Sequence, residues 1–259
     1  MANVTQLKHL EHLEDEMLNY GVEGCMASVN FLKELRKMLG CDNSTGFMQT
    51  KWDGAPSVVC GTDPNSGMFF VGTKSVFAKN SKACYDDVDV DLYYEGDLAE
   101  KLKYSLKYFS TLGIQGIVQG DLLFTTDVKR ETVNGEKLYT FTPNTITYGI
   151  PVDHPIGVAT GKAKIGVVFH THYRGNNFQT MQAVAGAKVK GSIEVLSVDN
   201  DTPMDRVGLN HSEEMLFDKY VANIEKMCAA SGDFLDELTT LSGTAGDAKW
   251  HVSSYLKQF

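Results

Sequence analysis

The spacing of apolar residues changes twice along this chain, and these changes limit the folds open to it. In residues 5–39 apolar side chains recur every three or four positions, the period of an amphipathic helix. From Phe47 to Val198 short apolar runs alternate with turn residues, as in strands. After Asp199 the helical spacing returns. Helices at both ends of a strand-rich middle predict an α+β fold.

This pattern predicts three regions. They are an N-terminal helical hairpin packed on the core (1–45), a core built on an antiparallel sheet (46–198) and a C-terminal helical segment (199–259). Helices are expected over 5–19, about 23–39, 98–112, 216–227 and 234–241, with a helical pattern again at 250–256. Gly21 separates the first two helices, because a glycine just after the last periodic residue is a common helix stop.

Composition excludes several classes of protein. The 259 residues are 42% hydrophobic and 22% charged, which is ordinary for a globular chain. No apolar run is long enough to span a bilayer, so we expect no membrane partner. The net charge of −9 is opposite to that of proteins that hold nucleic acid by bulk electrostatics, so contact with a polynucleotide needs a local basic groove or a partner protein.

The five cysteines are widely spaced and include no C-x-x-C pair. An odd number of isolated cysteines is typical of reduced thiols and not of a disulfide frame or a zinc site. We therefore expect a cytoplasmic protein, located in the host cell if it is viral.

The stretch Lys51-Trp52-Asp53-Gly54 precedes the first strand-like run, residues 57–61. A lysine at the edge of a strand, oriented by a nearby acid, is a covalent nucleophile once it has lost its proton. The alternative is a surface Lys-Asp pair that leads into a tight turn. A turn signal at 63–67 then predicts a hairpin that ends at Lys74. Lys51 and Lys74 would flank this hairpin, either sharing an anionic ligand or as two solvated lysines.

Asp121 lies inside the apolar run 116–124, which predicts a buried strand. A carboxylate there costs free energy unless it is paired or binds a metal, so the alternatives are a metal ligand and an acid paired with a core lysine. His170 and His172 are expected on one face of a later strand, 163–172. The six carboxylates of residues 84–97 are interpreted as a solvated loop.

These residues together carry a resemblance. Lys51-x-Asp53-Gly54 resembles the nucleotidyl-acceptor motif of the covalent nucleotidyltransferases, which include ATP-dependent DNA and RNA ligases and mRNA capping enzymes. Lys74 stands where that superfamily has an arginine. Gln119-Gly120-Asp121-Leu122 is similar to its apolar-Asp-Gly-Glu-Leu strand, with Gln for Asp and Asp for Glu. The run 165–170 resembles the strand that closes over the nucleotide base.

The resemblance implies a ligase-like, ATP-grasp-resembling core that uses ATP and Mg²⁺. Lys51 would be the catalytic residue that forms lysyl-AMP, and Asp121 would hold Mg²⁺. The implied nucleotide-binding residues are Asp53, Gly54, Lys74, Lys164, Phe169, Lys188 and Lys190. The acceptor would be an RNA or DNA end carrying a 5′-phosphate.

Residues 5–190 also resemble an uncharacterised group of proteins from large tailed phages, through Lys-Trp-Asp-Gly-Ala-Pro, Val-Gly-Thr-Lys-Ser, Gln-Gly-Asp-Leu and Val-Phe-His-Thr. The superfamily's later Glu-Gly strand is absent after Asp121, and no Lys-x-Lys pair follows such a strand. The missing elements imply either a second protein chain that supplies them or a catalytically inactive nucleotide-binding or protein-interaction module.

Overall fold

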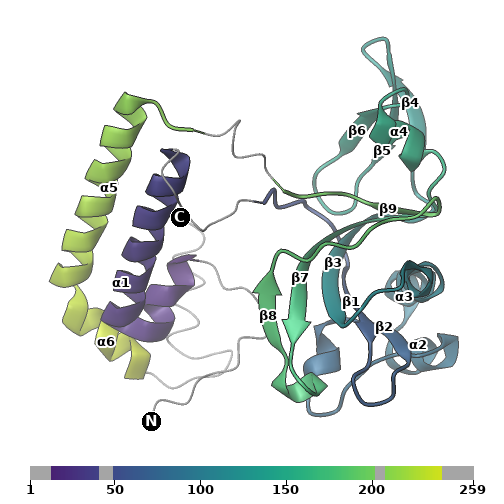
Figure 1. Cartoon of the computed structure of the whole chain (residues 1–259), viewed down its shortest axis with the longest axis horizontal. Helices are drawn as coiled ribbons and strands as arrows, with labels where there is room; N and C mark the ends of the chain where they lie inside the picture. Colours follow the sequence, from purple (N-terminus) through teal and green to yellow (C-terminus); the bar gives the residue numbers. More distant parts are fainter. Residues whose placement is uncertain (1–12, 41–48, 202–207, 241–259) are drawn as a thin grey trace. The chain divides into compact units, whose positions relative to one another are not determined.

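The computed structural model describes residues 13–40, 49–201 and 208–240. The chain divides into two compact units, which we call the sheet unit (described over 49–200) and the helical unit (described over 13–40, 201 and 208–240). Both units are drawn in Figure 1. The architecture is α+β, as the sequence predicts. Among the described residues, no helix has the length and apolar character needed to cross a membrane.

The sheet unit is built on a sheet of six strands in the order β2-β1-β3-β7-β8, with β9 paired to β7. Their bounds are β1 Ser57–Thr62, β2 Phe69–Gly72, β3 Ile117–Phe124, β7 Ile165–Arg174, β8 Gln182–Ala185 and β9 Val195–Ser197. All pairs are antiparallel except β7–β9, which is parallel. The predicted hairpin is confirmed as β1 and β2, and the predicted buried strand is confirmed as β3.

A second, three-stranded antiparallel sheet has the order β4-β5-β6. Its strands are β4 Lys129–Val133, β5 Glu136–Phe141 and β6 Tyr148–Pro151, and the helix α4 (Pro155–Thr160) contacts β5 and β6. The apolar runs 138–141 and 145–150 predict strands, which the structure has as β5 and β6, but no pattern predicts β4. All five residues of β4 are exposed, so β4 lacks the apolar alternation by which a strand is recognised.

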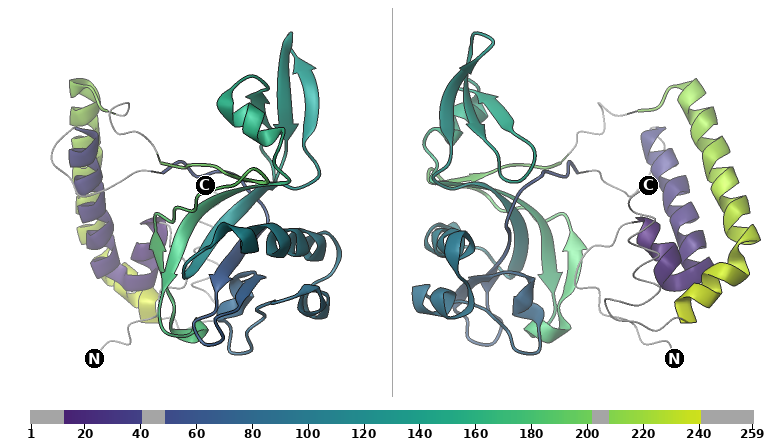
Figure 2. Two further views of the ribbon diagram at one scale, coloured as in Figure 1. Left: turned by 45° about the vertical axis from the view of Figure 1, so that its right-hand side comes forward. Right: turned by 180° about the vertical axis from the view of Figure 1, so that it is seen from behind.

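One face of the large sheet is covered by α3 (Gly96–Phe109), which contacts β1, β2 and β7 (Figure 2). Leu102 and Phe109 of α3 join Val58, Val118 and Val167 of the sheet in one core cluster. Two further clusters lie on the opposite face. The first includes Val59, Phe70, Ile117 and Tyr173, and the second includes Leu123, Phe124, Phe141 and Val168.

The acidic run is not the loop that we expected. Residues Asp87–Tyr93 form the helix α2, and the side chain of Asp86 caps it by accepting a hydrogen bond from the backbone N–H of Asp89 at 2.9 Å. Carboxylates at a helix N-terminus are favourable because the backbone N–H groups there point at them. Val90 is fully buried and is the residue of α2 that joins the core.

The helical unit consists of α1 (Leu13–Leu39), α5 (His211–Ala230) and α6 (Gly232–Thr240). The backbone of Gly21 leaves the helical conformation, with φ 61° and ψ −135°, which confirms the predicted break. Residues 5–12 and 250–256 of the predicted helices lie outside the described residues. Because α1 packs on α5 and α6, the N-terminal helix and the C-terminal helices belong to one unit.

Cys25 of α1 and Cys228 of α5 form a disulfide, with 6.0 Å between their Cα atoms. The expectation that all cysteines are reduced is therefore wrong for this pair. The two residues are 203 positions apart, and only the packing of α1 against α5 brings them together. Cys60 and Cys84 are free and buried.

Candidate functional site

The Lys51–Pro56 segment is an irregular loop that leads into β1. Two backbone hydrogen bonds fix it to β3: Ala55 N–H donates to the carbonyl of Leu122 at 2.9 Å, and Leu122 N–H donates to the carbonyl of Pro56 at 3.0 Å. The ring of Trp52 packs against Tyr148, with 4.9 Å between centroids. Lys51 itself is exposed. The loop is thus held at several points while its lysine faces solvent.

The carboxylate of Asp53 binds the tip of the β5–β6 loop. It accepts hydrogen bonds from Asn144 Nδ2 (2.8 Å), Thr145 Oγ1 (2.7 Å), Thr145 N (2.9 Å) and Ile146 N (3.1 Å). These bonds, led by the Thr145 hydroxyl and the Asn144 amide, hold the pKa of the Asp53 carboxyl far below its ordinary value. The aspartate of the Lys-x-Asp-Gly motif therefore anchors the lysine loop to the small sheet.

Gly54 lies directly against Asp121. A Cβ atom at Gly54 would be 2.6 Å from the Cβ of Asp121 and 2.8 Å from the carbonyl oxygen of Leu122. Leu122 belongs to the core cluster under α3, and neighbouring residues of a strand point to opposite faces. Asp121 and the lysine loop thus share the sheet face opposite α3, and only a residue without a side chain fits between them.

Asp121 stands in a row of polar side chains that crosses three strands. Ser57 of β1 is its direct register partner, and His170 of β7 places Nε2 at 3.3 Å from Asp121 Oδ1. This contact is a close approach without the geometry of a hydrogen bond. Asp121 and His170 are both partly exposed, with 18% and 27% of their side chains open to solvent. The partner of the carboxylate is thus a histidine, where the sequence suggested a core lysine or a metal ion.

A hydrogen-bonded chain lies next to this row on the same face. The hydroxyl of Tyr173 donates to Gln119 Oε1, and Gln119 Nε2 donates to Ser57 Oγ at 2.7 Å. Burial raises the pKa of Tyr173 well above its ordinary value, so its hydroxyl keeps the proton that it donates. Because Ser57 Oγ accepts here, its own hydroxyl proton is left to donate elsewhere.

His170 reaches Asp121 because β7 is irregular at this point. Gln119 and Gly120 are neighbours in β3 but oppose Thr171 and Phe169, so His170 is the extra residue of a β-bulge. Tyr173 contacts Gln119 on the face of Asp121, which turns the adjacent His172 to the other face. The expectation that His170 and His172 share a face is therefore wrong, because a bulge interrupts the alternation on which it depends.

The described residues include no group of three or more His, Cys, Asp or Glu side chains that could hold a metal ion. Mg²⁺ makes a smaller demand on protein, because it commonly takes one or two carboxylates and completes its shell with water and phosphate oxygens. The partly exposed carboxylate of Asp121 fits that role as a single ligand. Asp53 does not, because its oxygens are occupied by the β5–β6 loop.

Lys74 begins the short 3-10 helix η1 (Lys74–Phe77) directly after β2, and its side chain is exposed. Hydroxyl groups surround the backbone at this turn. Ser75 Oγ lies 2.8 Å from the hydroxyl of Tyr94 and 2.9 Å from Thr73 Oγ1. This network fixes the turn that presents Lys74 to solvent.

Phe169 is a core residue on the α3 face. Its ring is 2% exposed and packs edge-on against Phe109, with 5.5 Å between centroids. Lys164, Lys188 and Lys190 are exposed. Lys164 donates its backbone N–H to the carbonyl of Glu194 at 2.8 Å, just before β7 begins. The run from Lys188 through residues 192–198 predicts a strand, but the segment around Lys188 and Lys190 is irregular and β9 covers only Val195–Ser197.

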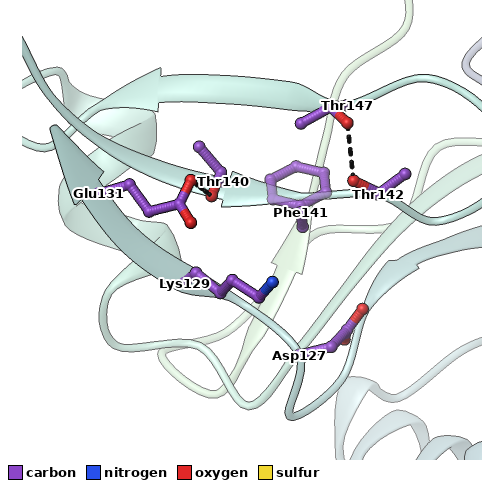
Figure 3. A pocket seen from close by; sticks show the side chains of 7 residues that line it. All are labelled: Asp127, Lys129, Glu131, Thr140, Phe141, Thr142 and Thr147. Carbon is purple, nitrogen blue, oxygen red and sulfur yellow. Dashed lines mark hydrogen bonds between the residues drawn. The ribbon is translucent and has the colours of Figure 1, made fainter. Parts of the chain in front are cut away.

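A cavity of about 400 Å³ lies on the small sheet, next to the loop that Asp53 binds (Figure 3). Its lining residues are Asp127, Lys129, Glu131, Thr140, Phe141, Thr142 and Thr147. The hydroxyls of Thr142 and Thr147 are 2.8 Å apart and close the base of the β5–β6 loop. Thr140 donates to Glu131 at 2.9 Å. The loop thus has its tip on Asp53 and its base on this cavity.

Charge is unevenly distributed over the sheet unit. Residues 83–100 contain seven carboxylates and no lysine or arginine. The rest of 49–200 contains nine carboxylates and fifteen lysines or arginines, a net charge of +6. Outside α2 and the start of α3, the sheet unit is therefore basic, although the whole chain is acidic.

Sequence reasoning missed Ser57, the 144–146 loop and the pairing of His170 with Asp121. The patterning of Ser57 gave no signal, because a serine at a strand start is ordinary. For His170 the signal was present, since a titratable residue inside an apolar strand needs a partner. The binding of Asp53 by residues more than 90 positions away has no local signature.

Comparison with known proteins identifies a family but assigns no activity to it. No curated protein and no solved structure was found to match the chain. One family model matches residues 3–259, nearly the whole sequence. The chain therefore belongs to DUF6267, a family of unknown function.

Proposed function

We propose that the sheet unit is a ligase-like nucleotidyltransferase in which Lys51 accepts AMP from ATP. The observation that carries the proposal is the construction of the lysine loop. Residues on both sides of Lys51 are fixed. Before it, Thr50 N–H donates to the carbonyl of Asn200 at 2.7 Å; after it, Asp53 is bound to the small sheet and Ala55 to β3, while the lysine itself stays exposed. A nucleophile held on a rigid support loses little freedom when it attacks, which favours the reaction.

The reaction has two steps. The neutral amine of Lys51, having given one proton to water, attacks the α-phosphorus of ATP. An N–P bond forms and the nitrogen releases a second proton to water, while the bond from the α-phosphorus to the bridging oxygen breaks and pyrophosphate leaves with that oxygen. A 5′-phosphate oxygen of an RNA or DNA end then attacks the same phosphorus. The N–P bond breaks, AMP passes to the nucleic-acid end, and Lys51 is restored.

The other proposed site residues bind and orient. Asp53 and Gly54 hold the loop, and Asp121 provides the carboxylate for Mg²⁺, which would offset the charge of the phosphates. Lys74, Lys164, Lys188 and Lys190 are exposed cations suited to phosphate groups. The +6 charge of the sheet unit outside residues 83–100 suits a polyanionic acceptor. A second chain would supply the Glu-Gly and Lys-x-Lys strands that this chain lacks.

A second candidate function is a catalytically inactive nucleotide-binding or protein-interaction module. Two observations favour it. The carboxylate of Asp53 is fully engaged in holding the β5–β6 loop, so the motif has a structural reason to exist. Phe169, the residue proposed to cover the base, is buried in the core.

The test is incubation of the full chain with α-labelled ATP or GTP and Mg²⁺, followed by a denaturing gel. We expect label that stays on the denatured protein, survives alkali and is released by acid, as an N–P bond requires, and that is lost in Lys51→Ala and in Lys51→Arg. Lys162→Ala, which removes an exposed lysine outside the proposed site, is the matched control and should label normally. If neither nucleotide labels the protein, even after a candidate second chain is added, the nucleotidyltransferase proposal is refuted and the catalytically inactive module is favoured.

A further inference from the structure

The outer face of α2 combines exposed apolar residues with uncompensated acid. Val88 and Leu92 are one helical turn apart and are 75% and 69% exposed. The carboxylate of Asp87 lies beside them at the start of the helix, and Glu95 follows α2. We call this surface, made of Asp87, Val88, Leu92 and Glu95, the α2 face.

The fold does not require the α2 face. Val90 alone buries α2 in the core. The helix is held from its inner side, where Asp89 accepts the backbone N–H of Tyr85 at 2.9 Å and Asp91 pairs with Lys103 of α3 at 2.6 Å. Polar residues at positions 88 and 92 would leave all of these contacts unchanged. Two large apolar side chains on a rigid, exposed support are typical of an interaction site.

Charge identifies the kind of partner. Residues 83–100 have a net charge of −7, and Lys101 and Lys103 compensate only part of it through Asp97 and Asp91. Asp87 and Glu95 have no ion pair within the described part of the chain. A surface with this charge repels nucleic acid and anionic lipid and attracts lysine and arginine.

The helical unit of the same chain is not complementary to the α2 face. Over residues 13–40 and 208–240 it contains twelve carboxylates and five lysines or arginines. It would therefore add repulsion at this surface. The lysine loop and Asp121 lie on the sheet face opposite α3, so a partner on α2 would leave them accessible.

We propose that the α2 face docks a basic amphipathic helix of a partner protein. Leucine-type side chains of the partner would pack on Val88 and Leu92, and its lysines or arginines would pair with Asp87, Glu95 and the neighbouring carboxylates. This is a helix-on-helix contact in which apolar burial provides the affinity and charge sets the orientation. The proposal is independent of the reaction assigned to Lys51.

The probe is a peptide of about 14 residues, four helical turns, with leucines on one face and lysines elsewhere. Its control is a peptide of the same composition with the leucines spread over all faces. Binding to the ¹⁵N-labelled full chain is followed by the chemical shifts of backbone amides. We expect shifts confined to α2 and the start of α3 with the amphipathic peptide, and much weaker binding of the control.

The variants separate apolar contact from charge. Val88→Ser with Leu92→Ser should weaken binding about tenfold or more without loss of folding, because both side chains are exposed. Asp87→Asn with Glu95→Gln should weaken peptide binding. The affinity of this variant should also fall less than that of the wild type when salt is raised to about 1 M, where the Debye length is about 3 Å. Ile193→Ser, at a residue 78% exposed outside α2, is the matched control and should bind normally.

Three results would overturn the proposal. They are shifts that map outside α2 and α3, equal binding of the two peptides, and unchanged affinity of the Val88/Leu92 variant. Analytical ultracentrifugation of the chain alone tests the remaining alternative, which is that the α2 face binds a second copy of this chain. A dimer that is lost in the Val88/Leu92 variant would assign the α2 face to a second copy of this chain and would also refute a basic partner.

Discussion

Asp53 and Thr145 are joined by two hydrogen bonds, from the Thr145 hydroxyl at 2.7 Å and from its backbone N–H at 2.9 Å, although 92 residues separate them in the sequence. This contact ties the loop that carries Lys51 to the tip of the β5–β6 loop. The position of the Lys51 loop therefore depends on both sheets, and the predictions on Asp53 below follow from this contact.

Asp53→Asn should release the β5–β6 loop. An asparagine offers one acceptor oxygen, and its amide N–H groups would face the N–H donors of Thr145 and Ile146. We expect faster hydrogen exchange at those two backbone amides, measured by NMR, and loss of any label on Lys51. Asp153→Asn, which changes an exposed aspartate, should leave exchange at 145 and 146 unchanged. Unaltered exchange in Asp53→Asn would show that the carboxylate is not the anchor.

The same contact predicts a dependence on pH. Because the folded pKa of Asp53 is lowered, its contribution to stability is complete above the ordinary carboxyl value of 3.8 and is lost as pH falls through the folded value. The difference in unfolding free energy between the wild type and Asp53→Asn should stay constant from about pH 7 to about pH 5 and shrink only in stronger acid. Urea unfolding at a series of pH values measures it. A difference that declines already between neutral pH and about pH 5 would contradict the lowered pKa.

Gly54→Ala should disturb the lysine loop through contact with Asp121. The added methyl would lie 2.6 Å from the Cβ of Asp121 and 2.8 Å from the carbonyl oxygen of Leu122, and the backbone of β3 prevents an easy adjustment. We expect a loss of stability of about 1–3 kcal/mol, the usual cost of overpacking. In Gly149→Ala the nearest atom is the flexible Leu138 Cδ1 at 3.1 Å, so this control should cost less. Thermal unfolding compares them, and equal costs would argue against the close approach.

Variants at Phe169 distinguish two roles for this residue: packing in the core and binding of the nucleotide base. Phe169→Ala should destabilise the chain by about 3–5 kcal/mol, as expected for a buried ring. Phe169→Leu keeps most of the apolar volume, so it should retain folding and bind nucleotide as the wild type does. Denaturant unfolding and nucleotide titration measure the two effects. Nucleotide binding that is lost in the folded Phe169→Leu protein would return Phe169 to the nucleotide site.

The disulfide between Cys25 and Cys228 should stabilise the helical unit. It closes a long loop, so its loss in Cys25→Ser should cost roughly 2–5 kcal/mol. The sheet unit has its own core and should keep its melting behaviour. Calorimetry of the wild type with and without reductant, beside Cys25→Ser, tests this. Peptide mapping without reductant should show the linked pair, and free thiols at both positions would contradict the bond.

Patterns that depend on near neighbours were predictable. The β1–β2 hairpin follows from the turn residues 63–67, the strand β3 from its apolar run, and the break in α1 from Gly21. The fully exposed strand β4 and the acidic helix α2 were not predictable from apolar spacing. In β4 there is no buried face, and in α2 only Val90 is buried, so neither shows the period of its own secondary structure.

The sequence by itself determined the α+β class, the order of the main elements and the identity of the residues around Lys51, because these depend on local spacing and turn chemistry. Only the tertiary structure decided what those residues contact. It bound Asp53 to the 144–146 loop, placed Gly54 on Asp121, turned His170 toward that carboxylate through a bulge, and buried Phe169 under α3. Each of these contacts joins positions far apart in the chain, and the packing of strands and helices, which no local pattern encodes, brings them together.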